Sequence, residues 1–317
     1  MAMFASGEAG VLHLSALAHE LGAAHDIATL PQVSEDPDLG ETLRHLGLAT
    51  FRRAAAPLLD LVEASCRKTI EQDPGAREQI GAFILATSSL GKPDTYQDGF
   101  RQLHARLGLR RAIPIGLFGS ECSNLGTAIG LAVDMIRAGR ISTALVVTAD
   151  IADDRTRIMP GLASVYSDGA ASCLVGRASG AGLQLEALSL HSSVDMARID
   201  PRGNVLAYLR GSMNGALAAV RACLAECHGE ISQFRRIVLG NYNQSVLNTY
   251  ATQLQVSPRD IYGDNVATVG HCYSADLLVN AKRLLDEDLL RDNERTLWIS
   301  SGHNTWGAMA IRRCGVA

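Results

Sequence analysis

The sequence predicts an α/β protein made of two similar halves, and two observations carry this prediction. Short apolar runs typical of buried strands alternate with longer segments in which apolar residues recur every three or four positions, as on one face of a helix. The order of these elements in the first half of the chain returns in the second half at a spacing of roughly 150 residues. Strands that alternate with helices form parallel sheets covered by helices. We therefore expect a duplicated α/β unit, with halves at residues 1–178 and 179–317.

The first half opens with segments in which we expect no strand. Residues 10–30 are expected to be helix and loop, and residues 31–40 to be loop, because prolines and glycine punctuate the second segment. The further elements follow in chain order: a helix at 54–71, a strand at 80–89, a helix at 98–109, a small-residue helix from Cys122 to Ala138, and strands at 144–150 and 166–176.

The second half repeats this order. The stretch that contains His191 and Asp195 is expected to be loop, and residues 217–227 an alanine-rich helix. The elements that match the first half are a strand at 236–243 that runs into polar residues, an extended approach at 260–271, a helix at 275–285, and strands at 296–302 and 304–313.

Composition excludes several classes of protein. A net charge of −4 and a pI near 6.1 provide no basic surface for nucleic acid. No apolar run approaches the roughly 20 residues that span a bilayer. The first residues lack the pattern of a secretory signal, so we expect a cytoplasmic protein. Its seven cysteines are then expected to be free thiols. Cys223, Cys227 and His228 lack a second ligand pair, so we expect no metal site.

Cys122 is the first candidate for chemistry. It stands where an apolar run gives way to the small-residue helix that begins near Ser123 or Asn124. A cysteine at a helix start meets the positive end of the helix dipole, which favours thiolate over thiol. A buried structural cysteine is the alternative.

The duplication supplies a partner for this thiol. The turn at Cys122 in the first half corresponds to the turn Gly270–Tyr273 in the second half, which contains His271. In two halves related by a pseudo-twofold axis, the two turns would face each other across the interface. We therefore expect the thiol of Cys122 and the imidazole of His271 to converge.

These residues resemble the thiolase superfamily, and within it the ketoacyl synthase III-like enzymes, over most of the chain after residue 75. The resemblance implies two duplicated α/β halves with packed mixed sheets, in five layers ordered α-β-α-β-α. It also implies that Cys122 accepts an acyl group from a thioester, with an oxyanion hole made by the N–H groups of Cys122 and Gly302. The segments that carry the resemblance are Glu121–Ser123 with its helix, Ala144–Asp150, Tyr166–Ala171 and Gly302–Ala308.

Two departures from the family pattern bear on the reaction. Condensing enzymes of the family carry a histidine in a His-Gln-Ala-Asn motif, but the matching segment here is Gly240–Asn243 and contains no histidine. They also carry an asparagine in a Gly-Asn motif, where this chain has His271. Decarboxylative condensation uses both side chains. What remains resembles the acyltransferase branch with a Cys-His-Asp set: Cys122, His271, and Asp276 once the turn between them unwinds.

We therefore expect an acyltransferase in which Cys122 carries the acyl group and His271 deprotonates the acceptor. Asn241, Asn243 and His303 are possible auxiliary residues of the site. The alternatives are a decarboxylative condensing enzyme of the ketoacyl synthase III type and a non-catalytic thiolase-like partner subunit.

No permanently bound cofactor is expected, because the acyl thioester of a carrier protein or of coenzyme A is a substrate. The acceptor would be a small molecule or a carrier-bound group, and the resemblance implies a homodimer. A carrier protein is favoured over coenzyme A, because the tryptophan and arginine with which relatives hold adenine have no counterpart. An acidic carrier would have a basic patch to dock on, formed by Arg110, Arg111, Arg137 and Arg140.

Overall fold

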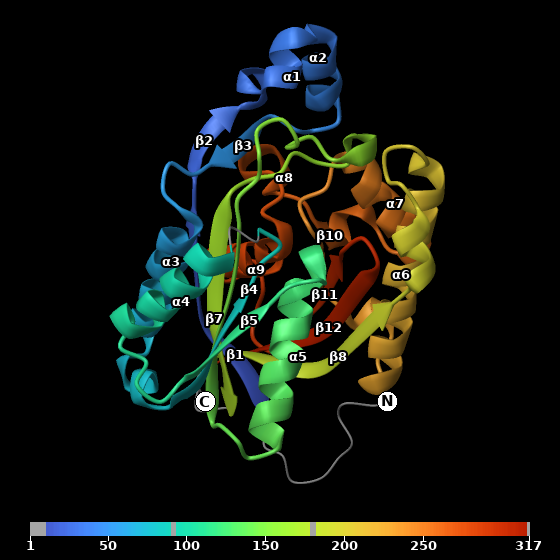
Figure 1. Cartoon of the computed structure of the whole chain (residues 1–317). Coiled ribbons are helices and arrows are strands. Elements are labelled where there is room, and N and C mark those ends of the chain that lie inside the picture. Colours follow the sequence, from blue (N-terminus) through green and yellow to red (C-terminus); the bar gives the residue numbers. More distant parts are fainter. Residues whose placement is uncertain (1–10, 90–92, 178–181, 316–317) are drawn as a thin grey trace.

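Ten strands form one mixed sheet whose order repeats between the two halves of the chain. The computed structural model describes residues 11–89, 93–177 and 182–315 (Figure 1). The strands of the first half are β1 (Leu12–Leu21), β4 (Ile80–Ala86), β5 (Ile113–Leu117), β6 (Thr143–Asp150) and β7 (Gly169–Arg177). Those of the second half are β8 (Gly182–Ser192), β9 (Arg236–Val238), β10 (Ile261–Tyr262), β11 (Arg295–Ser301) and β12 (Thr305–Cys314).

The spatial order β10-β9-β11-β12-β8-β1-β7-β6-β4-β5 reads the same from each edge toward the middle. In both halves the second strand lies parallel to the third and fourth, and the remaining pairs are antiparallel. Among the described strands of the sheet, the two halves pair where β1 meets β8, at His13–Gln184 and Leu14–Leu183. The duplicated α/β architecture is confirmed. The seam between β1 and β8 joins the two expected packed sheets into one continuous sheet. The boundary expected after residue 178 lies outside the described residues.

The helices lie in three layers around this sheet. Helices α5 (Asn124–Arg137) and α9 (Asp276–Asp286) pack between the halves and share a core with strands of both. Helices α3 (Leu58–Gln72) and α4 (Pro93–Arg106) cover the outer face of the first half. Helices α6 (Val205–Glu226) and α7 (Gln244–Leu254) cover that of the second half, at the right of Figure 1. The result is the expected succession of five layers, α-β-α-β-α.

The opening of the chain corrects the expectation of helix and loop at 10–30. This segment forms β1 and the short strand β2 (Ala23–Asp26), which pairs with β3 (Thr50–Arg53). A bulge explains the error, because the pairing of β1 with β7 shifts register between Ser15 and Ala18 and Ala16 adopts a positive φ of 51°. The bulge breaks the alternation of buried and exposed residues by which a strand is read from sequence.

Residues 31–40 are also not loop. They form α1 (Pro31–Glu35) and the first part of α2 (Pro37–His45), which project at the top of Figure 1. Each proline occupies the first helical position, where its missing N–H costs nothing. Asp36 caps α2 by accepting a hydrogen bond from the N–H of Leu39 at 3.4 Å. The prolines therefore start helices here.

The stretch around His191 and Asp195 differs from the loop that was expected. His191 belongs to β8, the long strand that opens the second half, and Asp195 lies in a 3₁₀ turn at Val194–Arg198. The helix expected at 217–227 is the C-terminal half of α6, which begins at Val205. No helix among the described residues is long and apolar enough to cross a bilayer.

Candidate active site

The site is built from two matching turns, one at the start of each central helix. A 3₁₀ turn at Glu121–Ser123 leads into α5, and another at Tyr273–Ala275 leads into α9. Each turn begins with a non-glycine residue in the left-handed region, Glu121 at φ 47° and Tyr273 at φ 53°. Non-glycine residues with this conformation are uncommon and cluster at functional sites.

The first residue of each helix ties its turn together. Asn124 Oδ1 accepts a hydrogen bond from the Ser120 N–H at 3.1 Å, and Asp276 Oδ1 accepts one from the Cys272 N–H at 2.7 Å. Both bonds reach back four residues. The two halves thus share the same local hydrogen-bonded turn. Cys122 stands in one turn, and His271 lies two residues before the other.

The structure brings Cys122, His271 and Asp276 together. Cys122 Sγ lies 3.2 Å from His271 Nε2, and His271 Nδ1 lies 2.5 Å from Asp276 Oδ2. Cys122 is 8% exposed, and His271 and Asp276 are fully buried. The 3₁₀ turn at Tyr273–Ala275 provides the unwinding that Asp276 needs to reach the ring from five residues along the chain.

The geometry assigns the protons in this trio. A carboxylate only accepts hydrogen bonds, so His271 Nδ1 carries the hydrogen and Nε2 is left with its lone pair facing Sγ. Burial, followed by the charges of Glu121, Asp150 and Asp276, raises the pKa of the Cys122 thiol well above its ordinary value. In this arrangement the Cys122 thiol can donate a hydrogen bond to the lone pair of His271 Nε2.

Asn241 has a different place from the one expected. Its backbone N–H donates to Asp276 Oδ2 at 2.6 Å, and its Nδ2 lies 2.8 Å from the Gly270 carbonyl and 3.2 Å from Asp276 Oδ1. Its side-chain donors are therefore already engaged, and they hold the carboxylate that contacts His271. Asn241 does not present a donor to a thioester.

The backbone N–H of Gly302 has two hydrogen-bond partners in the structure. Its N–H donates to the Thr305 carbonyl at 2.8 Å and lies 3.2 Å from Ser123 Oγ. This donor is occupied in the structure. The Cys122 N–H stands at the second position of its 3₁₀ turn, where a helical N–H has no partner within the helix. Among the described residues, no partner is given for the Cys122 N–H, whereas the Gly302 N–H faces Thr305 and Ser123.

The other two auxiliary candidates are structural. Asn243 caps α7 by accepting from the Val246 N–H at 2.9 Å, and its Nδ2 donates to the Leu162 carbonyl at 2.7 Å. His303 Nε2 lies 2.8 Å from the Met196 carbonyl, and its N–H donates to Glu121 Oε2 at 2.9 Å. Through this bond to its N–H, His303 holds Glu121, the residue with positive φ next to Cys122, and sequence reasoning did not foresee this contact.

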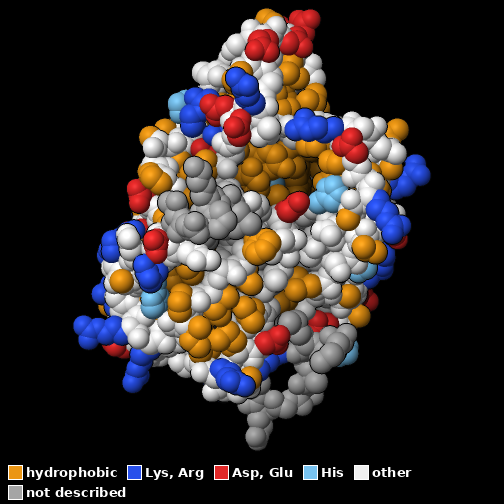
Figure 2. All heavy atoms as spheres, in the orientation of Figure 1, with side chains coloured by type: hydrophobic (Ala, Val, Ile, Leu, Met, Phe, Trp, Pro, Cys, Tyr) orange, Lys and Arg blue, Asp and Glu red, His pale blue; other side chains and the backbone are white. Residues whose placement is uncertain are grey.

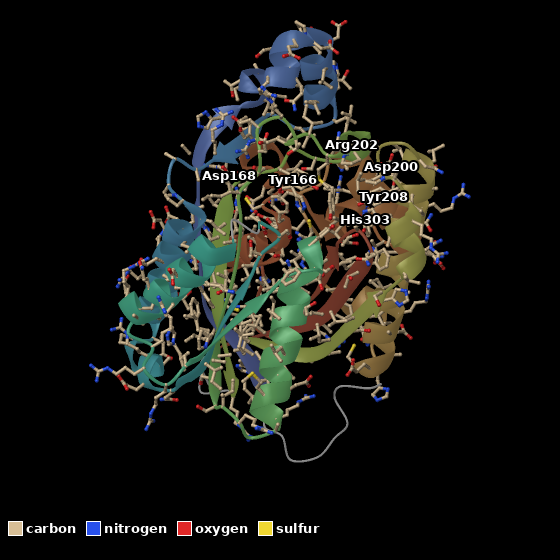
Figure 3. The ribbon with its side chains drawn as sticks, in the orientation of Figure 1. Tyr166, Asp168, Asp200, Arg202, Tyr208 and His303 are labelled. Carbon is tan, nitrogen blue, oxygen red and sulfur yellow. The ribbon has the colours of Figure 1, made fainter. Side chains whose placement is uncertain are left out.

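Aromatic rings enclose the imidazole. The ring centroids of Tyr242, Tyr166 and Tyr273 lie 5.2, 5.6 and 5.9 Å from that of His271. Figure 2 shows the surface hollowed above this region, with hydrophobic side chains inside the hollow. Tyr166, Tyr208 and His303 lie around the same region in Figure 3, with Arg202 and Asp200 at its upper rim.

Two arginines of the expected carrier-docking patch, Arg137 and Arg140, lie away from this opening. Arg137 ends α5, a helix of 14 residues whose opposite end starts beside Cys122. At 1.5 Å per residue the two ends are about 20 Å apart. Arg140 follows Arg137 beyond that far end. These two arginines therefore cannot line the hollow.

Asp150 is a buried group that the sequence did not single out. Its Oδ1 accepts hydrogen bonds from the Ser88 N–H at 2.6 Å, the Ser89 N–H at 3.0 Å and the Thr87 hydroxyl at 3.2 Å. Its Oδ2 has no hydrogen-bond partner among the described residues. Burial outweighs these hydrogen bonds and raises the pKa of Asp150 to about 7.

Within the described ranges, no group of three or more His, Cys, Asp or Glu side chains is placed to hold a metal ion. All seven cysteines are free thiols. Cys223 and Cys227, which were considered as ligands, lie at the C-terminal end of α6.

The sequence of this chain is similar to those of known proteins. The family model of 3-oxoacyl-[acyl-carrier-protein] synthase III matches residues 118–193, which include the Cys122 turn. The β-ketoacyl-[acyl-carrier-protein] synthase III of Gloeobacter violaceus is 26% identical over 288 residues, or 82% of this chain and 86% of that protein. A second such synthase, from Streptomyces coelicolor, is 27% identical over 254 residues, or 74% of this chain and 73% of that protein.

Solved structures share the fold. The 3-oxoacyl-(acyl carrier protein) synthase III of Pseudomonas aeruginosa PAO1 has a TM-score of 0.82 at 20% identity, covering 97% of this chain and 99% of that one. ChlB3, described as an acyltransferase, has a TM-score of 0.85 at 18% identity with the same coverage. In sequence and in fold, this chain is therefore similar to ketoacyl synthase III proteins.

Proposed function

We propose that this protein is an acyltransferase that moves an acyl group from a carrier thioester, through a Cys122 acyl-enzyme, to an acceptor nucleophile. The observation that carries the proposal is the buried chain from Cys122 Sγ through both nitrogens of His271 to Asp276, at 3.2 and 2.5 Å. A nucleophile, a base and a group that orients the base are the parts that nucleophilic acyl transfer requires.

In the first step His271 Nε2 takes the proton of the Cys122 thiol as Sγ attacks the thioester carbonyl. The oxygen of the tetrahedral intermediate carries the negative charge and accepts a hydrogen bond from the Cys122 N–H. The intermediate collapses by breaking the bond to the carrier sulfur, which leaves with the proton held by His271. The products are an acyl-enzyme, a free carrier thiol and a neutral imidazole.

In the second step the acceptor replaces the carrier. His271 Nε2 removes a proton from the hydroxyl, amine or thiol of the acceptor, whose heteroatom attacks the acyl carbonyl on Cys122. The Cys122 sulfur leaves and recovers the proton from His271. Asp276 stabilises the imidazolium in both steps and is not itself protonated.

A decarboxylative condensing enzyme is the second candidate, and the names of the relatives from Gloeobacter violaceus and Streptomyces coelicolor favour it. Such a reaction would need donors on the carbonyl of the extender thioester. Gly240 stands where the family histidine is expected, and the side-chain donors of the neighbouring Asn241 bind Gly270 and Asp276. Release of labelled carbon dioxide from a malonyl thioester by the wild-type protein would favour condensation over simple transfer.

The test is a search for the acyl-enzyme. The protein is incubated with a panel of acyl-carrier and acyl-coenzyme A thioesters, and the peptide that contains Cys122 is examined for added mass. We expect an adduct with at least one donor, none in Cys122→Ala, and an unchanged adduct in the control Cys227→Ala. No adduct from any donor would favour the third reading, a non-catalytic partner subunit.

The histidine variant separates the two steps. His271→Ala should still label slowly at high pH, where the thiolate forms without a base, and should then fail to pass the acyl group to added amine or alcohol acceptors. Onward transfer at the wild-type rate would show that His271 is not the base.

We further propose that the protein works as a homodimer that covers the edge of the sheet at β5. This edge strand exposes Ile113 (54%) beside Phe118 (68%), and Figure 2 shows hydrophobic side chains gathered on this face. Exposed apolar edges of this kind mark association sites. Phe118→Lys should give a monomer in sedimentation velocity while Leu206→Lys, also an exposed apolar site, should not. A monomeric wild type would refute the dimer.

A further inference from the structure

A line of buried amides connects Asp276 to the protein surface. Asn241 Nδ2 donates to Asp276 Oδ1 at 3.2 Å, and Asn241 Oδ1 accepts from Asn280 Nδ2 at 3.0 Å. Asn280 Oδ1 accepts from Asn265 Nδ2 at 2.7 Å, and Asn265 Oδ1 accepts from Arg283 Nη1 at 2.6 Å. We name the three asparagines and Arg283 the amide chain.

The two ends of the amide chain fix the direction of every hydrogen bond in it. Arg283 can only donate and the carboxylate of Asp276 can only accept, so each asparagine between them must turn its oxygen toward Arg283 and its nitrogen toward Asp276. Reversing one amide would set two donors or two acceptors against each other. The three amide dipoles are therefore aligned, with the positive guanidinium at one end and the negative carboxylate at the other.

The position of the amide chain argues for more than structural bonding. Asn241, Asn265 and Asn280 are all buried, whereas Arg283 is 37% exposed and also pairs with Glu287 at 2.7 Å. Buried polar groups are costly unless they are fully bonded, and apolar residues of the same size would serve packing alone. Hydrogen bonds in series polarise one another, and donors on a charged carboxylate favour its charged form.

We propose that the amide chain positions the Asp276 carboxylate, so that it keeps the His271 ring oriented toward Cys122. The inference rests on the proposed function, because it assigns a role to groups that act through the Cys122–His271 pair. Arg283, Asn265 and Asn280 are positioning residues in this view, and none of them touches the substrate. The amide chain thus links the trio of Cys122, His271 and Asp276 to Arg283 at the surface.

The probe for this role is iodoacetamide, because it reports on Cys122 without the natural substrate. The rate of Cys122 alkylation is measured from pH 5 to 10 by mass spectrometry of its peptide, with the half-buried Cys227 as an internal reference. Loss of Asp276 as an acceptor should appear as loss of reactivity on the acid side of this profile. The same titratable groups face the trio in all variants of the amide chain: Glu121, Asp150, Asp168, Tyr166, Tyr208, Tyr242, Tyr273 and Cys272.

Two variants cut the amide chain at different points. Arg283→Met removes its charged end and keeps an apolar stem, and Asn265→Leu interrupts its middle. Each should move the acid limb upward by about half to one pH unit, a shift that corresponds to a three- to tenfold lower rate on that limb. The double variant should shift no further than either single one, because both break the same chain. Arg283→Lys keeps the positive charge, so its acid limb should return at least halfway from the position in Arg283→Met to that in the wild type.

Glu287→Gln is the matched control. It breaks the other ion pair of Arg283 and leaves the bond to Asn265 intact, so its profile should equal that of the wild type. Wild-type profiles for Arg283→Met and Asn265→Leu, in proteins with unchanged melting temperature, would overturn the amide chain. If Asn265→Leu does not fold, the Met and Lys variants of the half-exposed Arg283 decide the question. Alkylation of Cys122 that is insensitive to His271→Ala would instead refute the proposed function itself.

Discussion

Replacing Asp276 by asparagine removes one charge from the site with almost no change in shape. In the wild type, Oδ1 accepts from the Cys272 N–H and Asn241 Nδ2, and Oδ2 accepts from the Asn241 N–H and His271 Nδ1. An amide has only one oxygen, so two of these four donors must face an NH2 group. The orientation of the new amide determines which two donors lose their acceptor, and therefore what effect the substitution has.

If the new NH2 group faces His271, the imidazole must accept at Nδ1 and carry its hydrogen on Nε2. That hydrogen then points at Cys122 Sγ, and the ring cannot take the thiol proton. The wrong tautomer at such a histidine lowers the rate by about 10⁴-fold in a serine protease triad. If the NH2 group instead faces Cys272 and Asn241, two buried donors clash, at roughly 1–3 kcal/mol for each unpaired group. We expect the acylation rate of Asp276→Asn to fall by about 10³- to 10⁴-fold, which corresponds to about 4–5.5 kcal/mol.

The assay is a single-turnover measurement of Cys122 acylation by an acyl-N-acetylcysteamine thioester at pH 7, quenched and quantified by mass spectrometry. Asp286→Asn is the control, because Asp286 lies on the same helix and forms an exposed ion pair with Lys282. Thermal melting of both variants verifies the fold. A rate for Asp276→Asn within tenfold of the wild type would refute the assignment of Asp276 as the residue that orients His271.

Three further predictions concern stability. Burial raises the pKa of Asp150 from 3.8 to about 7, so the ionised side chain is unfavourable in the fold and the stability of the wild type should decline between pH 4 and pH 7. Relative to the wild type, Asp150→Asn should gain stability over this window, by up to about 4 kcal/mol above pH 7 in urea unfolding. A gain that does not depend on pH would contradict this reasoning. Asn243→Ala should lose about 1–2 kcal/mol in the same assay, because it removes the cap of α7; no loss would mean that the cap is not needed. Gly215→Ala would place a methyl group within 2.4 Å of the Trp306 ring, so it should destabilise the protein by about 1–3 kcal/mol, whereas the melting temperature would be unchanged if α6 could move away freely.

Sequence reasoning located most of the helices and strands in which apolar residues are regularly spaced. The buried strands β4 and β6 and the helices α5 and α9 follow the expected spans closely. It missed β1 and β8, the first strand of each half. The bulge at Ala16 hides the period of β1, and β8 ends in exposed residues that look like loop. Both strands meet at the seam between the halves, which no local pattern reveals.

The site residues that lie in recognisable sequence motifs were predictable. The duplication and the motifs pointed to Cys122, His271 and Asp276, which the structure brings into one hydrogen-bonded line. The bonding of Asn241 and Gly302 was not predictable, because it depends on which donors the folded chain has already paired. Hydrogen-bond partners far apart in sequence are set by tertiary packing, and one sequence does not contain them as a pattern.

The matching turns before α5 and α9 have a consequence for how such a site originates. If a single ancestral half-chain once paired with its own copy, each copy already offered a left-handed residue followed by a helix whose first side chain gripped the turn. Gene fusion then allowed the copies to diverge, so that one helix begins with the amide of Asn124 and the other with the carboxylate of Asp276. The two turns share one backbone conformation and differ in their side chains, so the proposed nucleophile and base stand on two versions of the same local structure.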